Sequence, residues 1–354
     1  MRLEKLGLNN WFKDKIDPAK LIEFQLARVI TVNKDSYIIR NEKKEVFAEV
    51  TGKIKFKADS PLDYPTVGDW VYAKYLDQES FAVINEILPR KTILKRKTSG
   101  KKIDFQLIAA NIETAFIVQA LDFNYNLRRL ERYLAMINEG NIRPIVLLSK
   151  DDLLSSMEVK EKISEIHAVM PDIQVVAFSN ITTSGLVELE KLLVSGETFC
   201  LLGSSGVGKT SLLNTLLAEE RFEVQAVREK DGRGRHTTAY RQLIILKNGA
   251  MLIDTPGMRE LGNIGLESGI DNTFEEITEL SKHCRFNNCS HLQDEGCAVL
   301  AALKDGRISQ ERYQNYIKMN KESTYYEMSY LQKRRKNRQF GNFIKSVKKH
   351  IKKR

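Results

Sequence analysis

Residues 203–210, with the sequence Gly-Ser-Ser-Gly-Val-Gly-Lys-Thr, have the composition and spacing of a phosphate-binding loop. Its glycines allow backbone N–H groups to curl around phosphate oxygens, and the helix that follows points its positive end at them. Lys209 is expected to reach the β- and γ-phosphates, and the Thr210 hydroxyl to bind Mg²⁺. An apolar strand ends at Leu202, and helical spacing continues from Ser211 to Leu217. The sequence therefore predicts a nucleotide site made of Gly203, Ser204, Ser205, Gly206, Val207, Gly208, Lys209, Thr210 and Ser211.

A second element, Asp254-Thr255-Pro256-Gly257, follows the apolar strand 250–253. Asp254 is expected to hold the Mg²⁺ shell through a water molecule, and the backbone amide of Gly257 to sense the γ-phosphate. Four residues of this kind are weak alone, but their place at a strand end downstream of a phosphate loop makes them informative. We expect Asp254 and Gly257 to complete the phosphate side of the site.

The segment 232–238, Gly-Arg-Gly-Arg-His-Thr-Thr, lies between these two elements and has the composition of a mobile switch. A threonine there can complete the Mg²⁺ shell when a triphosphate is bound. Thr237 and Thr238 are both candidates, and we favour Thr238.

The catalytic group has to come from outside the usual position. Many small GTPases place a water-orienting glutamine directly after the Asp-x-x-Gly element, but this chain has Met258, whose thioether cannot orient water. His236 in the predicted switch is the nearest candidate for positioning water or acting as a general base. The alternative is that His236 only braces the loop or faces solvent.

A guanine-reading segment, residues 149–152, precedes all of these elements. The Asp152 carboxylate can accept two hydrogen bonds from the guanine edge, and Lys150 is expected to pack along the ring. The usual Asn before the Lys is Ser149 here, whose shorter side chain removes at least one contact, about 0.5–1.5 kcal/mol. Modest affinity with retained guanine preference is therefore expected. The predicted base-side residues are Ser149, Lys150, Asp151 and Asp152, with Ser179 and Asn180 capping the base through the backbone.

The order of these elements is that of a circular permutation. An ordinary GTPase runs phosphate loop, Asp-x-x-Gly, base-reading segment, whereas here the last element has moved to the front. From about residue 111 strands and helices alternate, which predicts a parallel sheet flanked by helices with the loops at its carboxyl edge. The predicted strands are 114–118, 143–148, 174–178 and 198–202, and the predicted helices are 127–139 and 158–170.

The first part of the chain predicts a separate small barrel. About five short strands with turn residues between them fall within residues 26–95, which suits a barrel of the OB type, although SH3-like barrels have a similar pattern. The expected strands are a hairpin around Val29–Thr31 and 37–39, then 46–50, 69–73 and 82–88.

Three cysteines and one histidine are spaced as metal ligands. Cys284-x4-Cys289-x-His291-x5-Cys297 supplies three thiolates and one imidazole, a closed tetrahedral set for zinc that leaves no position for water. A structural Zn²⁺ is therefore expected, the alternative being scattered core residues. Clustering of this kind favours metal over a disulfide. Cys200 lies in an apolar strand and is expected to be a core thiol.

Composition and charge set the broad class of protein. A chain of 354 residues predicts two or three domains. The formal net charge is +10, yet residues 328–354 carry eleven Lys and Arg and no acidic residue, so the rest is near neutral. Such a tail suits binding to a polyanion, although a merely solvated tail is the alternative. No apolar run approaches the roughly 20 residues of a membrane span, and no secretory segment is evident. We expect a cytoplasmic protein.

Together these motifs resemble the circularly permuted, ribosome small-subunit-dependent GTPase A family (RsgA or YjeQ). Besides the nucleotide elements, Gly-Arg-His-Thr-Thr and the Cys-Arg-Phe-x-x-Cys-x-His run, the resemblance includes Tyr64-Pro65-Thr66-Val67-Gly68-Asp69-Trp70-Val71, Leu88-Pro89-Arg90 and Arg312-Tyr313, and it covers nearly the whole chain.

The resemblance implies four segments: an OB-fold domain at 1–95, a permuted GTPase domain at 96–265, a helical zinc domain at 266–327 and a basic tail at 328–354. It implies a monomer that binds the small (30S) ribosomal subunit and its 16S rRNA during late maturation. GTP would be hydrolysed to GDP with stimulation by the subunit, using Mg²⁺, with one structural Zn²⁺. In the family the histidine of the switch, here His236, is tied to hydrolysis.

Two further hypotheses concern the RNA-contacting parts. Lys53, Lys55 and Lys57 alternate along one predicted strand face and are candidates for rRNA contact, or form an ordinary wet face. The chain passes directly from the second switch into the zinc domain, so a γ-phosphate-dependent shift could re-aim that domain. The rival functions are an RNA-binding assembly factor in which GTP hydrolysis is incidental, and an ATP-dependent enzyme, against which Asp152 argues.

Overall fold

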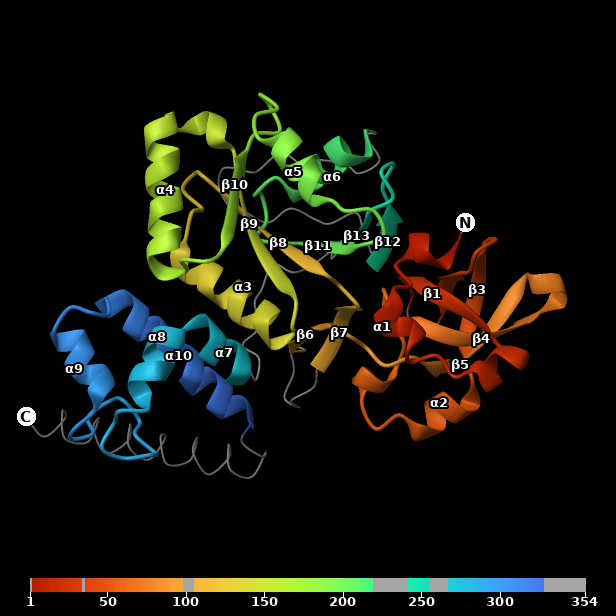
Figure 1. Ribbon diagram of the computed structural model, residues 1–354, viewed down its shortest axis with the longest axis horizontal. Coiled ribbons are helices and arrows are strands. Elements are labelled where there is room, and N and C mark those ends of the chain that lie inside the picture. Colours follow the sequence, from red (N-terminus) through yellow and green to blue (C-terminus); the bar gives the residue numbers. More distant parts are fainter. Residues whose placement is uncertain (1, 34–35, 98–104, 219–240, 255–266, 328–354) are drawn as a thin grey trace, which may run out of the picture. The chain divides into compact units, whose positions relative to one another are not determined.

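The computed structural model describes residues 2–33, 36–97, 105–218, 241–254 and 267–327. The chain forms two compact units, one of residues 1–96 with 105–261 and the other of residues 97–104 with 262–354. Figure 1 colours both units along the chain. The finer domain boundaries drawn from the sequence stay predictions.

Five strands at the start of the first unit close into a barrel. They are β1 (Gln25–Val32), β2 (Tyr37–Arg40), β3 (Glu45–Val50), β4 (Trp70–Leu76) and β5 (Phe81–Ile87). The order β1-β2-β3-β5-β4 is closed by pairing of β4 with β1, and β3 with β5 is the parallel pair. Alternate residues point inward, so that Val29, Ile39, Val46 and Ile84 share one core. The predicted barrel of the OB type is confirmed.

Short helical segments surround the barrel. Leu6, Leu8 and Phe12 of the N-terminal segment pack with Trp70 and Tyr72, which gives this segment its own apolar cluster. The segments are η1 (Leu3–Leu6), α1 (Asn10–Lys13), η2 (Pro18–Ile22), η3 (Pro61–Asp63) and η4 (Asp77–Glu79).

The three lysines proposed as RNA contacts do not lie on a strand. They are in helix α2 (Gly52–Lys57), which begins where the Thr51 side chain accepts a hydrogen bond from the Ile54 amide. Lys53 and Lys57 therefore share one helical face and Lys55 lies on another, although all three are exposed. The expected alternation along one strand face is wrong.

The rest of the first unit contains the predicted parallel sheet. Its strands are β8 (Thr114–Ala120), β9 (Arg143–Ser149), β10 (Gln174–Phe178), β11 (Thr198–Leu202), β12 (Arg241–Ile245) and β13 (Met251–Asp254), in the order β10-β9-β8-β11-β13-β12. All are parallel except β12, which runs antiparallel to β13. The helices are α3 (Leu127–Glu139), α4 (Ser156–Val169), α5 (Leu186–Leu192) and α6 (Lys209–Leu217).

Helices cover both faces of this sheet. Apolar residues of α5 and α6 pack on one face in a single core with Phe116 and Phe199, whose rings stack 5.3 Å apart. Helix α3 contacts β8 and β9, and Figure 1 shows it on the side of the sheet away from α5 and α6. It begins at Asn126, whose side chain caps the Arg129 amide, and buries Leu130, Leu134 and Ile137 at helical spacing. The predicted alternating architecture is confirmed.

Backbone pairing joins the barrel to this sheet. Thr31 and Val32 of β1 pair with Gln242 and Arg241 of β12, so that one eleven-stranded sheet runs through the first unit. Two further strands that the sequence analysis did not identify, β6 (Ile93–Lys97) and β7 (Phe105–Ala110), pair with one another.

A buried arginine lies between the barrel and the sheet. Arg28 of β1 donates to the Gly68 and Asn111 carbonyls, both at 3.2 Å, and to the Thr198 hydroxyl at 2.8 Å. It also donates to the Leu6 carbonyl. Burial lowers the pKa of Arg28 to about 10, against the attraction of Glu113 and Asp69, so the guanidinium stays charged at neutral pH.

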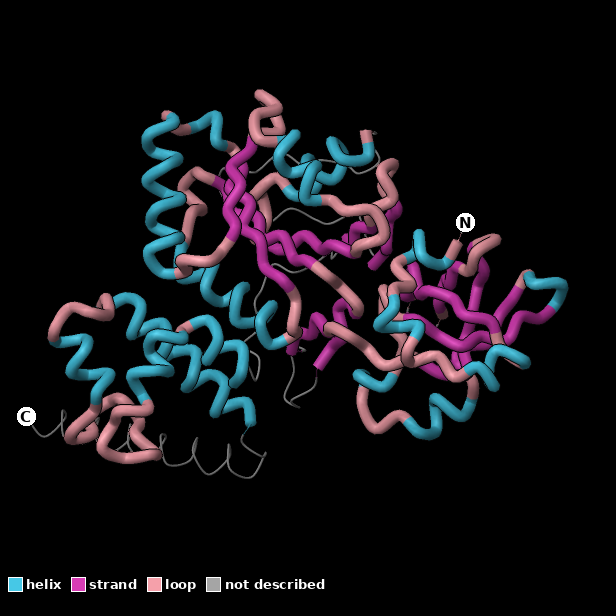
Figure 2. Tube along the Cα trace, in the orientation of Figure 1, coloured by secondary structure: helices cyan, strands magenta, loops and turns pink. Residues whose placement is uncertain are grey.

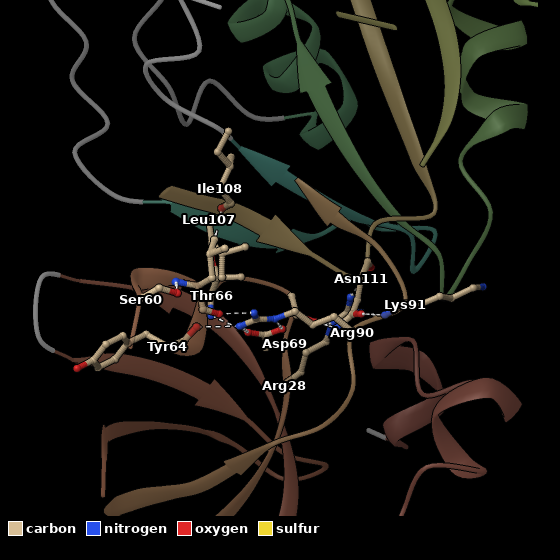
Figure 3. Close-up of polar contacts among 12 residues, drawn as sticks. Arg28, Ser60, Tyr64, Thr66, Asp69, Arg90, Lys91, Leu107, Ile108 and Asn111 are labelled. Carbon is tan, nitrogen blue, oxygen red and sulfur yellow. Dashed lines mark hydrogen bonds and ion pairs between the residues drawn. The ribbon is translucent and has the colours of Figure 1, made fainter. Parts of the chain in front are cut away.

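A buried ion pair lies beside it (Figure 3). Arg90 holds Asp69 in a bidentate pair, with N–O distances of 2.8 and 2.7 Å, and the Thr66 amide donates to the same carboxylate at 2.8 Å. Arg90 also donates to the Leu62 and Tyr64 carbonyls. Burial raises the pKa of Asp69, although the Arg90 guanidinium acts in the opposite direction. Asp69 and Arg90 belong to the Tyr-Pro-Thr-Val-Gly-Asp-Trp and Leu-Pro-Arg motifs, so these two motifs contain the partners of one buried ion pair.

Residues 267–327 of the second unit are helical, as predicted, with loops between the helices (Figure 2). Its helices are α7 (Glu267–Thr273), α8 (Glu275–Ser281), α9 (Ala298–Lys304) and α10 (Gln310–Glu327). Arg312 of α10 donates to the Thr273 carbonyl at 3.0 Å and to Glu276 at 2.9 Å. None of the helices in the described ranges is long and apolar enough to cross a membrane. The basic tail 328–354 lies outside the described residues.

We predict that Arg90→Ala lowers the free energy of unfolding by about 3–5 kcal/mol, because it leaves the Asp69 carboxylate buried without its partner. Lys13→Ala removes an exposed ion pair with Glu4 and should leave stability nearly unchanged. Urea denaturation followed by circular dichroism measures both. Equal effects of the two substitutions would contradict this account of the junction.

Candidate nucleotide site and Cys/His cluster

Strand register brings the predicted nucleotide-binding segments to one edge of the sheet. Ser149 at the end of β9 pairs with Phe178 of β10 and with Ala120 of β8. Leu202 at the end of β11 pairs with Ile117 of β8. Because parallel strands end at a common edge, the segments that follow β9, β10 and β11 lie together there.

The phosphate loop has the backbone conformation that its glycines permit. Gly203, Gly206 and Gly208 have φ angles of +145°, +78° and +91°. A Cβ at Gly203 would lie 2.3 Å from the Val118 carbonyl oxygen, so a side chain is excluded there. Helix α6 begins at Lys209, so its N-terminus includes the last residues of the motif and lies at the site. This arrangement presents backbone amides to an anion.

Two cations converge on the first residues of the loop. Lys209 Nζ donates to the Gly203 carbonyl at 2.7 Å and to the Ser204 carbonyl at 2.6 Å. Arg129 Nη1 donates to the Ser204 hydroxyl at 2.9 Å. Among the described residues Arg129 has no ion-pair partner. This contact was not predicted from the sequence, because Ser204 lies 75 positions from Arg129 along the chain.

The base-reading segment is organised by local ion pairs and hydrogen bonds. Lys150, at φ +60°, forms an ion pair with Asp122 at 2.7 Å. The Asp151 carboxylate accepts from the Ser184 hydroxyl at 2.7 and 2.8 Å, which connects the loops after β9 and β10. Asp152 belongs to the short helix η5 (Asp151–Leu153) and is exposed.

Ser149 makes a contact that the sequence alone did not indicate. Its buried hydroxyl lies 2.6 Å from the Val207 carbonyl and 3.3 Å from the Gln119 carbonyl. A hydroxyl has one proton to donate, and the shorter distance assigns it to the phosphate loop. The serine therefore ties β9 to the loop, while the expectation of modest affinity stays a prediction.

The loop after β10 lies beside the same part of the phosphate loop. Ser179 is buried, and its hydroxyl accepts from the Ile181 and Thr182 amides at 2.9 and 3.2 Å. The Asn180 amide nitrogen lies 3.4 Å from the Gly208 carbonyl. Ser149, Asn180 and the phosphate loop are thus brought together.

Several predicted residues cannot be placed. His236, Thr237, Thr238, Gly257 and Met258 lie outside the described residues. Asp254 ends β13 at the same edge as the phosphate loop, but its side chain is outside the described part. The roles predicted for these residues stay predictions.

The predicted metal ligands form a compact cluster in the second unit. One ligand atom from each of Cys284, Cys289, His291 and Cys297 lies within 4.8 Å of the others. His291 Nδ1 is 3.6 Å from Cys284 Sγ and 3.4 Å from Cys297 Sγ, and the two sulfurs are 3.9 Å apart. Tetrahedral coordination at the Zn–S distance places ligand sulfurs about 3.7 Å apart, so the spacing fits such an ion.

Surrounding residues position this cluster. Cys297 is the N-cap of α9, with its sulfur accepting from the Leu300 amide, and the Tyr313 hydroxyl donates to the His291 carbonyl at 2.6 Å. Burial lowers the pKa of His291, against the pull of Asp294, which favours the neutral, metal-binding imidazole. Cys200 lies apart in β11, where burial raises the pKa of its thiol, as expected of a core cysteine.

Solved structures with the same fold define the class of protein. YjeQ from Thermotoga maritima matches with a TM-score of 0.61 and 23% identity, covering 85% of this chain and 99% of that one. YloQ, described as a circularly permuted GTPase, matches with a TM-score of 0.60 and 23% identity, covering 87% and 98%. At this identity the likeness shows the fold alone, which is that of a circularly permuted GTPase.

Sequence relatives identify the family. The family model described as RsgA GTPase matches residues 87–264. Small ribosomal subunit biogenesis GTPase RsgA 2 of Vibrio vulnificus (strain CMCP6) is 35% identical over 345 residues, covering 98% of this chain and 95% of that protein. The protein of the same name from Lactiplantibacillus plantarum is 39% identical over 332 residues, covering 93% and 92%. This chain belongs to the RsgA GTPase family, and the predicted GTPase activity is confirmed.

We predict that Gly203→Ala lowers the free energy of unfolding by about 1–3 kcal/mol and weakens nucleotide binding, because the Val118 carbonyl would have to move. Gly52→Ala is the matched control: its Cβ meets no atom within 4 Å, so stability should be unchanged or slightly higher. Thermal unfolding and nucleotide titration of both variants test this. A Gly203→Ala protein as stable as Gly52→Ala would contradict the close approach.

Proposed function

We propose that this protein hydrolyses GTP to GDP in the late maturation of the small (30S) ribosomal subunit, which stimulates the reaction. The main observation in support of the proposal is that strand register brings the phosphate loop and the base-reading segment to one edge of the parallel sheet. Family membership supports it, since the two relatives named as small-subunit biogenesis GTPases match this chain over 98% and 93% of its length.

Different parts of the nucleotide site are proposed to bind different parts of GTP. Backbone amides of residues 203–211 hold the phosphates, and Lys209 moves from its carbonyl partners to the β- and γ-phosphates. Arg129 adds positive charge at the same end of the loop. Asp152 accepts hydrogen bonds from guanine.

Mg²⁺ supplies neutralisation of the charge that develops on the phosphates. Thr210, in the first turn of α6, and Asp254, at the end of β13, come from adjacent parts of the sheet edge and would hold it. Thr238 is proposed to complete the shell.

Hydrolysis is proposed to depend on His236. Met258 replaces the water-orienting residue of many small GTPases, so another group must hold the attacking water. A histidine in the switch has a suitable range of protonation states. Subunit binding would stimulate turnover by fixing the position of this segment.

The Cys/His cluster is proposed to hold one structural Zn²⁺. Three thiolates and one neutral imidazole fill a tetrahedral shell, so no coordination position is left for a reacting water. The ion would fix the loop between α8 and α9 within the second unit.

Contact with 16S rRNA is proposed to involve basic groups at both ends of the chain. Lys53, Lys55 and Lys57 of α2 are exposed and remain candidates after the change from strand to helix. The tail 328–354 supplies further positive charge in the sequence. We further propose that the protein acts as a monomer in the cytoplasm.

The proposal predicts that 30S subunits, but not 50S subunits, increase GTP hydrolysis by the purified protein at fixed salt. His236→Ala should lower the stimulated rate by about 10²–10⁴-fold while subunit binding remains, as expected for loss of a general base or water-positioning group. His167→Ala, at an exposed position in α4, is the control and should behave as the native chain. Tight 30S binding without stimulation would instead support an assembly factor for which GTP is a structural ligand.

Zinc removal gives a second prediction. Metal analysis should find one zinc ion per chain. The ion should be lost in Cys289→Ser and retained in Cys200→Ser, because Cys289 belongs to the cluster and Cys200 does not. Basal hydrolysis should survive in Cys289→Ser, since the nucleotide site belongs to the other compact unit, while 30S stimulation is lost. Retention of zinc by Cys289→Ser would contradict the ligand set. Loss of basal hydrolysis would contradict the hypothesis that the zinc domain responds to the second switch without being needed for hydrolysis itself.

A further inference from the structure

Two side chains from neighbouring strand ends flank Gly208 of the phosphate loop. Ser149 ends β9 and pairs with Phe178, so Asn180 follows just beyond the same point on β10. A Cβ at Gly208 would lie 3.1 Å from the Asn180 amide nitrogen and 4.0 Å from the Ser149 hydroxyl. Both side chains therefore occupy the base side of the loop.

The hydrogen-bonding capacity of these two side chains differs. Ser149 has one proton, which it donates to the Val207 carbonyl at 2.6 Å, so it has none left for a base. The Asn180 amide nitrogen has two protons, and one approaches the Gly208 carbonyl at 3.4 Å. A second proton of Asn180 is available to an acceptor.

The amide orientation of Asn180 is set by its surroundings. The opposite orientation would place Oδ1 against the Gly208 carbonyl, bringing two acceptors together. In the orientation observed, Oδ1 is buried and accepts no hydrogen bond from the described residues. Oδ1 cannot bind a base acceptor, so the second proton of the amide nitrogen is the group of Asn180 that such an acceptor can use.

We propose that the Asn180 side chain donates a hydrogen bond to N7 of the guanine base and so supplies the amide contact that Ser149 cannot make. Guanine presents N7 and O6 as acceptors on one edge. N7 belongs to the ring that carries the ribose, so it is the acceptor nearer the phosphate loop, where the Asn180 nitrogen lies. The inference rests on the proposed binding of guanine nucleotide at this edge.

This assignment changes the reading of the serine at position 149. Ser149 binds the phosphate loop, and Asn180 donates to the base. An asparagine side chain at position 149 would have two amide protons and could make both hydrogen bonds by itself. The shorter Ser149 side chain then brings no loss of base recognition. Asn180 acts here through its side chain, in addition to the backbone contact predicted from the sequence.

The test compares GDP with 7-deaza-GDP, which lacks N7, in equilibrium titrations of the full chain. The native protein should bind 7-deaza-GDP roughly tenfold more weakly than GDP, about the value of one hydrogen bond. Asn180→Ala should bind both nucleotides alike, at the affinity of native protein for 7-deaza-GDP. Thr182→Ala, an exposed neighbour in the same loop, should keep the native preference.

A rescue variant separates base contact from loop bracing. Adding Ser149→Asn to Asn180→Ala should restore both affinity and the preference for GDP, because the amide is returned from the adjacent strand end. Equal binding of GDP and 7-deaza-GDP by the native protein overturns the inference without any variant. Failure to bind either nucleotide overturns the proposed function itself, and the inference with it.

Discussion

The common carboxyl edge of β8, β9, β10, β11 and β13 is the constraint on which the nucleotide site depends. Parallel pairing places Ser149, Phe178 and Leu202 at the ends of their strands on one side of the sheet. The loops after these strands therefore meet, whichever is reached first along the chain. A circular permutation changes the order of the motifs in the sequence but leaves the order β10-β9-β8-β11-β13-β12 in the sheet to assemble the site.

The barrel is joined to the nucleotide-binding sheet by backbone hydrogen bonds. Strand β1 pairs with β12, which begins only three residues after Thr238 of the predicted switch. Arg28 adds hydrogen bonds from β1 to both sides of the junction, and the Asp69–Arg90 pair fixes the adjoining turn. The nucleotide-binding sheet and the barrel thus share backbone hydrogen bonds between β1 and β12, a strand that follows the predicted switch closely in the sequence.

The sequence predicted secondary structure correctly where capping residues and the spacing of apolar residues indicate the same element. Helix α3 matched its predicted bounds because Asn126 caps it and its apolar residues keep helical spacing, and the strands after it are short apolar runs. Local alternation misled at Lys53–Lys57, where the Thr51 cap favours a helix. Arg28 and Arg129 could not be recognised from the sequence, because neither the burial of Arg28 nor hydrogen bonds to residues 170 and 75 positions away leave a local sequence signal.

The central claim, that Asp152 makes this edge a guanine site, is tested most directly by the base specificity of Asp152→Asn. The proposed role has the carboxylate accept from guanine N1–H and the 2-amino group, whereas an asparagine amide would donate to the 2-oxo group of xanthine. Titration of the variant should therefore show weak binding of GDP and gain of binding to xanthosine diphosphate, with the native protein showing the reverse. Unchanged preference for GDP in Asp152→Asn would mean that the base is read elsewhere and would contradict the account.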